Sequence, residues 1–141
     1  MAVEVRSTDV NKALVRRAIG YNHGVAEEPT ELFAPDFVAY LPGQPPMDRA
    51  MLERFMAGFG LGFPGHTIEI QDQIARGDIV VNRTTVRGVQ DDEFAGVPAT
   101  GRPIEVSAIV MFKVKDGRVV EQRAELDFLG LLQQIGASPP A

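Results

Sequence analysis

The chain has no cysteine and no tryptophan, and its 141 residues include only two histidines. Without cysteine it can form no disulfide, no thiolate nucleophile and no zinc–thiolate site, and this composition suits a reducing compartment. His23 and His66 lie far apart in the sequence, and neither belongs to a motif with metal-ligand spacing. The sequence therefore predicts neither a metal site nor a cofactor, and the cytoplasm is the expected location.

Positive charge is also scarce. The 14 Lys and Arg residues against 19 Asp and Glu residues leave a formal net charge of -5. A phosphate backbone would on average be repelled, which argues against a nucleic-acid partner. Glu4, Arg6 and Asp9 interrupt the stretch where a signal peptide would need apolar residues, and no later stretch resembles a membrane span. We therefore expect neither nucleic acid nor a membrane as a partner.

What is present is the composition of a folded protein, with 45% hydrophobic and 23% charged residues. A chain of this length suits one domain, residues 1–141, which can bury a core and keep room for one pocket. We expect frayed ends at residues 1–7 and 137–141.

The first half of the chain predicts two amphipathic helices. The first can be capped by Ser7 or Thr8 and stop at Gly24. Its apolar residues fall on one stripe, namely Val10, Leu14, Ala18 and Tyr21. The second can be capped by Asp48, and its apolar residues are spaced three and four apart, namely Met51, Leu52, Phe55, Met56 and Phe59. Each helix has one apolar face and must pack against another element.

The second half predicts strands. From Thr67 onward the apolar residues recur at every second position, and residues 76–78 suit the turn of a long hairpin. A second hairpin joins residues 103–115 to residues 118–126 through Asp116-Gly117, a dipeptide that tolerates positive φ in a tight turn.

The order of elements predicts the fold class. Residues 30–33 suit a helical turn, residues 37–41 an early strand, and a short helix is expected from Phe128. Helices followed by a run of antiparallel strands favour an α+β domain, with N-terminal helices covering one face of a curved antiparallel or mixed sheet.

Three motifs in the last third occur in a fixed order. Residues 93–101 contain F-x-G-x-P-x-T-G, Asp116-Gly117 closes a hairpin, and Asp127 precedes Leu131-Leu132-Gln133-Gln134. With this order the chain, over roughly residues 36–136, resembles the SnoaL-like polyketide cyclase family.

The resemblance implies more than the residue pattern does. It implies the cone-shaped nuclear transport factor two-like fold with an internal cavity, and a homodimer formed through the outer face of the sheet. It also implies a hydrophobic or aromatic small-molecule substrate and a place in antibiotic biosynthesis.

Asp127 is the first candidate for catalysis, because it matches the acid/base aspartate of small polyketide cyclases. The alternative is that Asp127 caps the helix that follows. Alternation places four charged residues on one face of this strand, namely Glu121, Arg123, Glu125 and Asp127. That face borders either solvent or a polar pocket. Arg123 stands where many family members carry tryptophan, and Arg123 and Glu105 complete the set of catalytic candidates.

The candidates for substrate binding come from four places. They are the end of the first helix, the early strand over residues 37–41, the apolar cluster of the second helix, and the two strands of the second hairpin. The full set is Tyr21, Asn22, His23, Tyr40, Phe55, Phe59, Ser107, Met111 and Glu125. Gln90 stands where the family has a histidine, so a role that depends on that histidine does not transfer.

The resemblance implies cofactor-free acid/base chemistry, an intramolecular aldol closure in which Asp127 removes a carbon-bound proton and later returns one. Three alternatives stay open at this stage. One is an epoxide hydrolase in which Arg123 works with Asp127 or Glu105. The second is an enzyme that assists polyketide hydroxylation, and the third a non-catalytic small-molecule-binding domain of the same fold.

Overall fold

The computed structural model describes residues 2–24 and 31–137, with side chains from residue 7 onward. These residues form three helices and five strands. In chain order the elements are α1 (Ala2–Asn22), β1 (Phe33–Tyr40), α2 (Arg49–Gly62), β2 (Thr67–Arg76), β3 (Ile79–Val89), β4 (Pro103–Lys115), β5 (Arg118–Leu126) and α3 (Phe128–Gln134).

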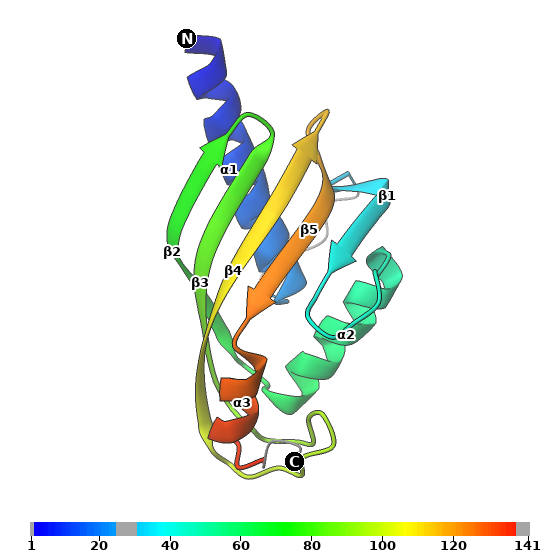
Figure 1. Cartoon of the computed structure of the whole chain (residues 1–141), viewed down its shortest axis with the longest axis vertical. Coiled ribbons are helices and arrows are strands. Elements are labelled where there is room, and N and C mark those ends of the chain that lie inside the picture. The colour runs from blue at the N-terminus through cyan, green and yellow to red at the C-terminus, as the bar shows by residue number, and fades with distance from the viewer. Residues whose placement is uncertain (1, 25–30, 138–141) are drawn as a thin grey trace.

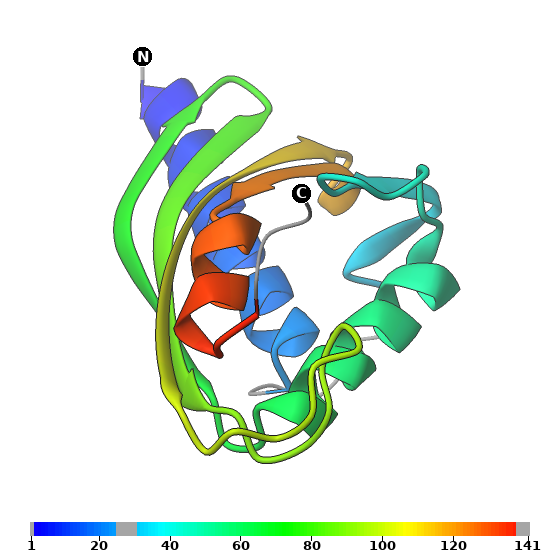
Figure 2. The ribbon, with the colours of Figure 1, turned by 60° about the horizontal axis from the view of Figure 1, so that its bottom comes forward.

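The strands form one mixed sheet in the order β1-β5-β4-β3-β2 (Figure 1). β1 pairs with β5 in parallel, and the other neighbours are antiparallel. The sheet curls, and the three helices lie on its concave side (Figure 2). The predicted α+β class, with N-terminal helices on one face of a curved mixed sheet, is confirmed.

Local sequence explains most of these elements. Asp116 and Gly117 both have positive φ (52° and 74°) and close the β4–β5 hairpin as expected. The Asp48 carboxylate accepts a hydrogen bond from the Met51 backbone N–H at 2.8 Å, so Asp48 caps α2.

Two expected elements differ from the structure. α1 begins at Ala2, so Ser7 and Thr8 lie inside the helix and neither caps it as expected. β1 already begins at Phe33, where the helical turn over residues 30–33 was expected, because Phe33 pairs with Val119 of β5. Residue 30 and the C-terminal residues 138–141 lie outside the described part of the chain.

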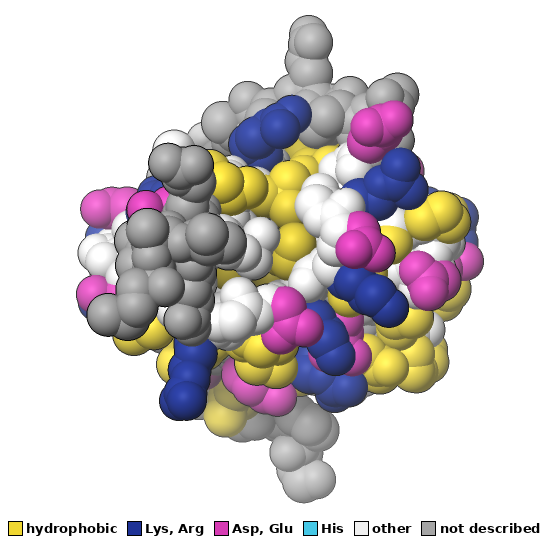
Figure 3. Space-filling view, turned by 90° about the horizontal axis from the view of Figure 1, so that it is seen from above, with side chains coloured by type: hydrophobic (Ala, Val, Ile, Leu, Met, Phe, Trp, Pro, Cys, Tyr) yellow, Lys and Arg dark blue, Asp and Glu magenta, His cyan; other side chains and the backbone are white. Residues whose placement is uncertain are grey.

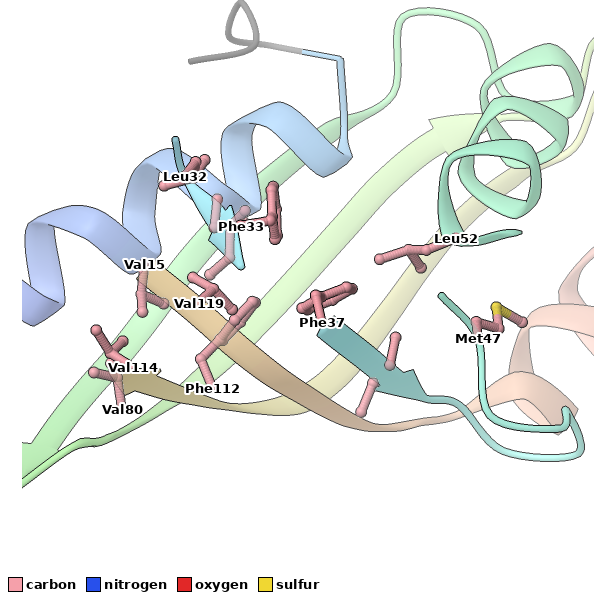
Figure 4. Close-up of a cluster of buried hydrophobic side chains, with 14 of the residues drawn as sticks. Val15, Leu32, Phe33, Phe37, Met47, Leu52, Val80, Phe112, Val114 and Val119 are labelled. Carbon is pink, nitrogen blue, oxygen red and sulfur yellow. The ribbon is translucent and has the colours of Figure 1, made fainter. Parts of the chain in front are cut away.

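Two clusters of buried apolar residues occupy the concave side. The larger joins α1, β1, α2 and one end of the sheet, as Figure 4 shows for Val15, Phe37 and Phe112. The smaller joins the end of α2, β4 and α3 through Phe63, Val106 and other residues. The space between the clusters is where a cavity opens.

Within the described residues, no helix is long and apolar enough to cross a membrane.

Candidate functional site

A cavity of about 290 Å³ lies against the concave face of β3, β4 and β5. The end of α1, the middle of α2, the loop after β1 and the start of α3 close its sides. Most of its lining is apolar, with side chains that include Phe55, Met56, Phe59, Val86, Phe94, Val106, Ala108, Val110, Phe112, Ala124, Leu126, Phe128 and Leu131. Such a wall suits a hydrophobic ligand.

A few polar side chains interrupt this wall. Asn22 at the end of α1 donates a hydrogen bond from Nδ2 to Oε1 of Gln122 on β5, at 3.0 Å. Thr84 of β3 is buried, and in the described part of the chain its hydroxyl has no hydrogen-bond partner. Gln44 and His23 complete the polar lining. A buried hydroxyl without a hydrogen-bond partner lowers the stability of the fold, so a ligand that hydrogen-bonds to Thr84 would gain binding energy.

His23 is the only side chain with an ordinary pKa near neutrality among the described lining residues, and the lining includes no Asp, Glu, Lys or Arg. Its Nδ1 lies 3.1 Å from Nε2 of His66, and Nδ1 of His66 lies 3.0 Å from the Phe63 carbonyl oxygen. The Phe59 ring packs edge-on against His66, with 4.7 Å between ring centroids. The two imidazole rings and the Phe63 carbonyl group therefore form one continuous chain of hydrogen bonds.

Burial and, to a smaller extent, the neighbouring His66 together lower the pKa of His23 from 6.5 to about 4. At neutral pH the His23 ring is therefore uncharged, which suits the apolar wall that it borders.

The free energy of unfolding should accordingly fall by about 3 kcal/mol as pH falls from 6.5 to about 4, through His23 alone. The unfolded chain binds more protons in this window, so the contribution is complete above pH 6.5 and is lost as pH falls through the folded pKa. Urea unfolding across this range measures the effect, with His23→Gln as the control that lacks the titrating ring. Parallel pH profiles for wild type and variant would contradict it.

The family profile of the SnoaL-like polyketide cyclases matches residues 12–135, a stretch that includes every residue lining the cavity. The chain belongs to the SnoaL-like polyketide cyclase family. The predicted family is confirmed.

Solved structures agree with this membership. A candidate SnoaL-like polyketide cyclase from Jannaschia has a TM-score of 0.84 and 26% identity, covering 94% of this chain and 95% of its own. IdmH, a candidate polyketide cyclase from Streptomyces antibioticus, has a TM-score of 0.77 and 34% identity, covering 90% and 99%. AclR, a candidate hydroxylase from Streptomyces galilaeus, has a TM-score of 0.82 and 26% identity, covering 94% and 99%. No curated protein sequence matches this chain.

Four of the residues predicted from sequence lie on the wall of this SnoaL-like cavity, namely Asn22, His23, Phe55 and Phe59. Tyr21 lines instead a second pocket of about 320 Å³, together with His23, His66 and Glu53. Its hydroxyl donates to Glu53 Oε1 at 2.7 Å, and burial together with Glu53 raises the pKa of Tyr21.

The site residues predicted on β4 and β5 point away from the cavity. On β4 and β5 the inward positions are Ala108, Val110, Phe112, Gln122, Ala124 and Leu126, so their neighbours take the outer face. Those neighbours are Glu105, Ser107, Met111, Arg123, Glu125 and Asp127, and none of them lines the cavity. Apolar residues occupy the concave face because it packs against the helices, which leaves the charged face to solvent.

The charged candidates on the outer face have partners there. Arg123 forms an ion pair with Glu121 at 3.2 Å, and its guanidinium carbon lies 4.0 Å from the centroid of the Tyr40 ring. Glu105 pairs with Arg87 at 2.8 Å. Figure 3 views the end of the molecule where the β2–β3 and β4–β5 hairpins lie, and there too basic and acidic side chains are interspersed. The homodimer expected from the family stays a prediction.

Asp127 is exposed and caps α3: its Oδ1 accepts a hydrogen bond from the Gly130 backbone N–H at 2.9 Å. A Cβ on Gly130 would run into this carboxylate, so the glycine leaves room for the cap. Leu126 and Phe128, on either side of Asp127, do line the cavity. The aspartate therefore lies next to the site in sequence while its side chain is engaged with the helix.

Sequence reasoning missed several polar residues of the site, among them Thr84, Gln122 and His66. Thr84 and Gln122 carried a signal, because each is a polar residue in the inward phase of an alternating strand. His66 carried none, since only tertiary packing brings it to His23.

Proposed function

We propose that this protein is a small acid/base enzyme that closes a ring on an enolisable, polyketide-type substrate. The observation that carries the proposal is the apolar cavity with a few uncharged polar groups, found in a chain of the SnoaL-like polyketide cyclase family. An apolar wall binds the hydrophobic body of such a substrate, and the polar groups can donate hydrogen bonds to its carbonyl oxygens.

The reaction would be an intramolecular aldol closure. A base takes a proton from a carbon next to a carbonyl, the enolate carbon forms a bond to a second carbonyl carbon, and the resulting alkoxide takes up a proton. Atoms balance without an oxidant, so a base and hydrogen-bond donors suffice. Thr84 and the amide groups of Gln44 and Gln122 are among the donors on the cavity wall.

Deuterium labelling tests the function directly. Wild-type protein is incubated with an enolisable anthraquinone-type ester in deuterated buffer, and label uptake and ring closure are followed by mass spectrometry. We expect both to exceed the rate in buffer alone. Absence of exchange and of closure with wild type would count against an enzyme and favour a binding role for the cavity.

Asp127 needs a separate test, because family resemblance assigns it the base while its carboxylate caps α3 and is exposed. We expect Asp127→Asn to keep turnover within a few-fold of wild type, since asparagine caps helices as well as aspartate does. Asp127→Ala should lower the free energy of unfolding by about 1 kcal/mol. A hundredfold loss of turnover in a stably folded Asp127→Asn protein would instead identify Asp127 as the base.

A second candidate function has one supporting observation, the likeness to AclR, a candidate hydroxylase. A product heavier than the substrate by one oxygen atom would favour this role in polyketide hydroxylation. The epoxide-hydrolase alternative needs Arg123 beside Asp127 or Glu105, whereas Arg123 pairs with Glu121.

A further inference from the structure

The chain of hydrogen bonds from Phe63 through His66 to His23 ends at the wall of the cavity. We propose that His23 is the base that takes the proton from the substrate carbon, and that His66 is the residue that positions it. This inference rests on the proposed ring-closing function and names the residues that would perform it.

The hydrogen-bond chain sets the tautomer of both rings. A carbonyl oxygen only accepts, so the hydrogen on His66 lies on Nδ1 and is donated to Phe63. The Nε2 of His66 then carries a lone pair and accepts, which requires Nδ1 of His23 to donate. The remaining nitrogen of His23, Nε2, is left with a free lone pair. A base oriented by a hydrogen bond at its other nitrogen is the arrangement that makes histidine effective in catalysis.

The backbone also holds His23 in place. The His23 N–H donates to the Ile19 carbonyl at 3.1 Å and closes the last turn of α1, after which Gly24 turns the chain with φ of 72°. His23 borders both the apolar cavity and the second pocket, so its ring forms part of the partition between them.

Among the residues that the structure describes, His23 has no carboxylate as a hydrogen-bond partner. From α2, Glu53 reaches the second pocket, but it accepts from Tyr21 at 2.7 Å and pairs with Arg49 at 3.4 Å. His66, from the loop between α2 and β2, is the other titratable group on that side. The low pKa of His23, about 4, follows from this setting and keeps the lone pair available at neutral pH.

The same setting narrows the class of substrate. A neutral imidazole with a free lone pair is a weak base, and it removes protons efficiently only from acidic carbons, such as those flanked by two carbonyl groups. In the proposed step the carbon–hydrogen bond breaks, its proton goes to Nε2 of His23, and its electron pair forms the enolate. The imidazolium later returns the proton to the alkoxide. The substrate would therefore be a β-dicarbonyl compound with a hydrophobic body.

Deuterium exchange of ethyl benzoylacetate, an aromatic β-keto ester, tests this assignment. Exchange at the carbon between the two carbonyls is measured by NMR in deuterated buffer, and binding by saturation transfer from the protein. Wild type should accelerate exchange, and His23→Gln should lose at least about a hundredfold of this rate while still binding the ester. His23→Asn provides a second substitution if the first folds poorly, as judged by circular dichroism.

His66→Gln tests the positioning role. We expect about a tenfold slower exchange, with the midpoint of the pH–rate profile moved upward because His66 no longer opposes protonation of His23. A purely structural role would leave that midpoint unchanged and would overturn the role of His66. Wild-type exchange rates in His23→Gln, or a hundredfold loss in Asp127→Asn alone, would overturn His23 as the base and leave the proposed function intact. Failure of wild type to bind or exchange the ester would overturn both.

Discussion

Replacing Ala108 with phenylalanine should weaken binding of an apolar ligand by at least about a hundredfold, or about 3 kcal/mol of binding free energy. Ala108 lies on the inward face of β4, between Thr84 of β3 and Leu126 of β5, and all three line the cavity. An aromatic ring at this position would occupy the space that the ligand needs. Titration of the β-keto ester into each protein, followed by NMR, gives the two dissociation constants.

Ser107→Phe is the matched control for this substitution. Ser107 is the adjacent residue of β4, but its side chain is on the outer face and does not line the cavity. The control should therefore bind the ester like wild type. Equal affinities for all three proteins would mean that the ligand binds elsewhere and would remove the basis of the proposed function.

Replacing Gln90 with leucine should lower the free energy of unfolding by about 3 kcal/mol and the melting temperature by roughly 10 °C. The side chain of Gln90 is fully buried and holds the loop that follows β3. Its Nε2 donates to the Val97 carbonyl at 2.9 Å, and its Oε1 accepts from the Thr100 N–H at 3.1 Å and the Thr100 hydroxyl at 2.7 Å. Leucine fills the same space but makes none of these bonds.

The effect of this substitution should reach the cavity, because the loop carries Phe94, one of its lining residues. Hydrogen exchange measured by mass spectrometry should show faster exchange over residues 91–101 in Gln90→Leu. Thr100→Val, which removes one of the three bonds, should cost only about 1 kcal/mol. Unchanged melting and exchange in Gln90→Leu would contradict a structural role for this glutamine.

Gln90 shows how a departure from the family pattern is resolved by structure. The resemblance in sequence places Gln90 at a position where a histidine is expected, and it could say only that a role for that histidine does not transfer. The structure gives the position a function in holding the loop, through contacts with residues seven and ten positions further along the chain.

The elements that could be predicted from sequence are those governed by local interactions. The β4–β5 turn follows from the conformational freedom of Asp116-Gly117, and the start of α2 follows from the capping carboxylate of Asp48. Period-two alternation predicted the strands of the hairpins, because neighbouring residues of a strand point to opposite faces of the sheet. β1 was harder, because its start depends on pairing with β5 at the far end of the chain.

Local sequence patterns therefore predict the family, the α+β class and the sorting of each strand into two faces. Which face borders the cavity depends on how the strands pack against the helices. Alternation puts Arg123 and Asp127 on the same face, but it does not tell whether that face borders the cavity or the solvent. The opposite, apolar face packs against the helices, so the face with Arg123 and Asp127 points outward. His23 and His66 lie 43 residues apart and carry no shared motif. They meet because α1 and the loop after α2 close the same side of one curved sheet, a long-range arrangement that no local pattern encodes.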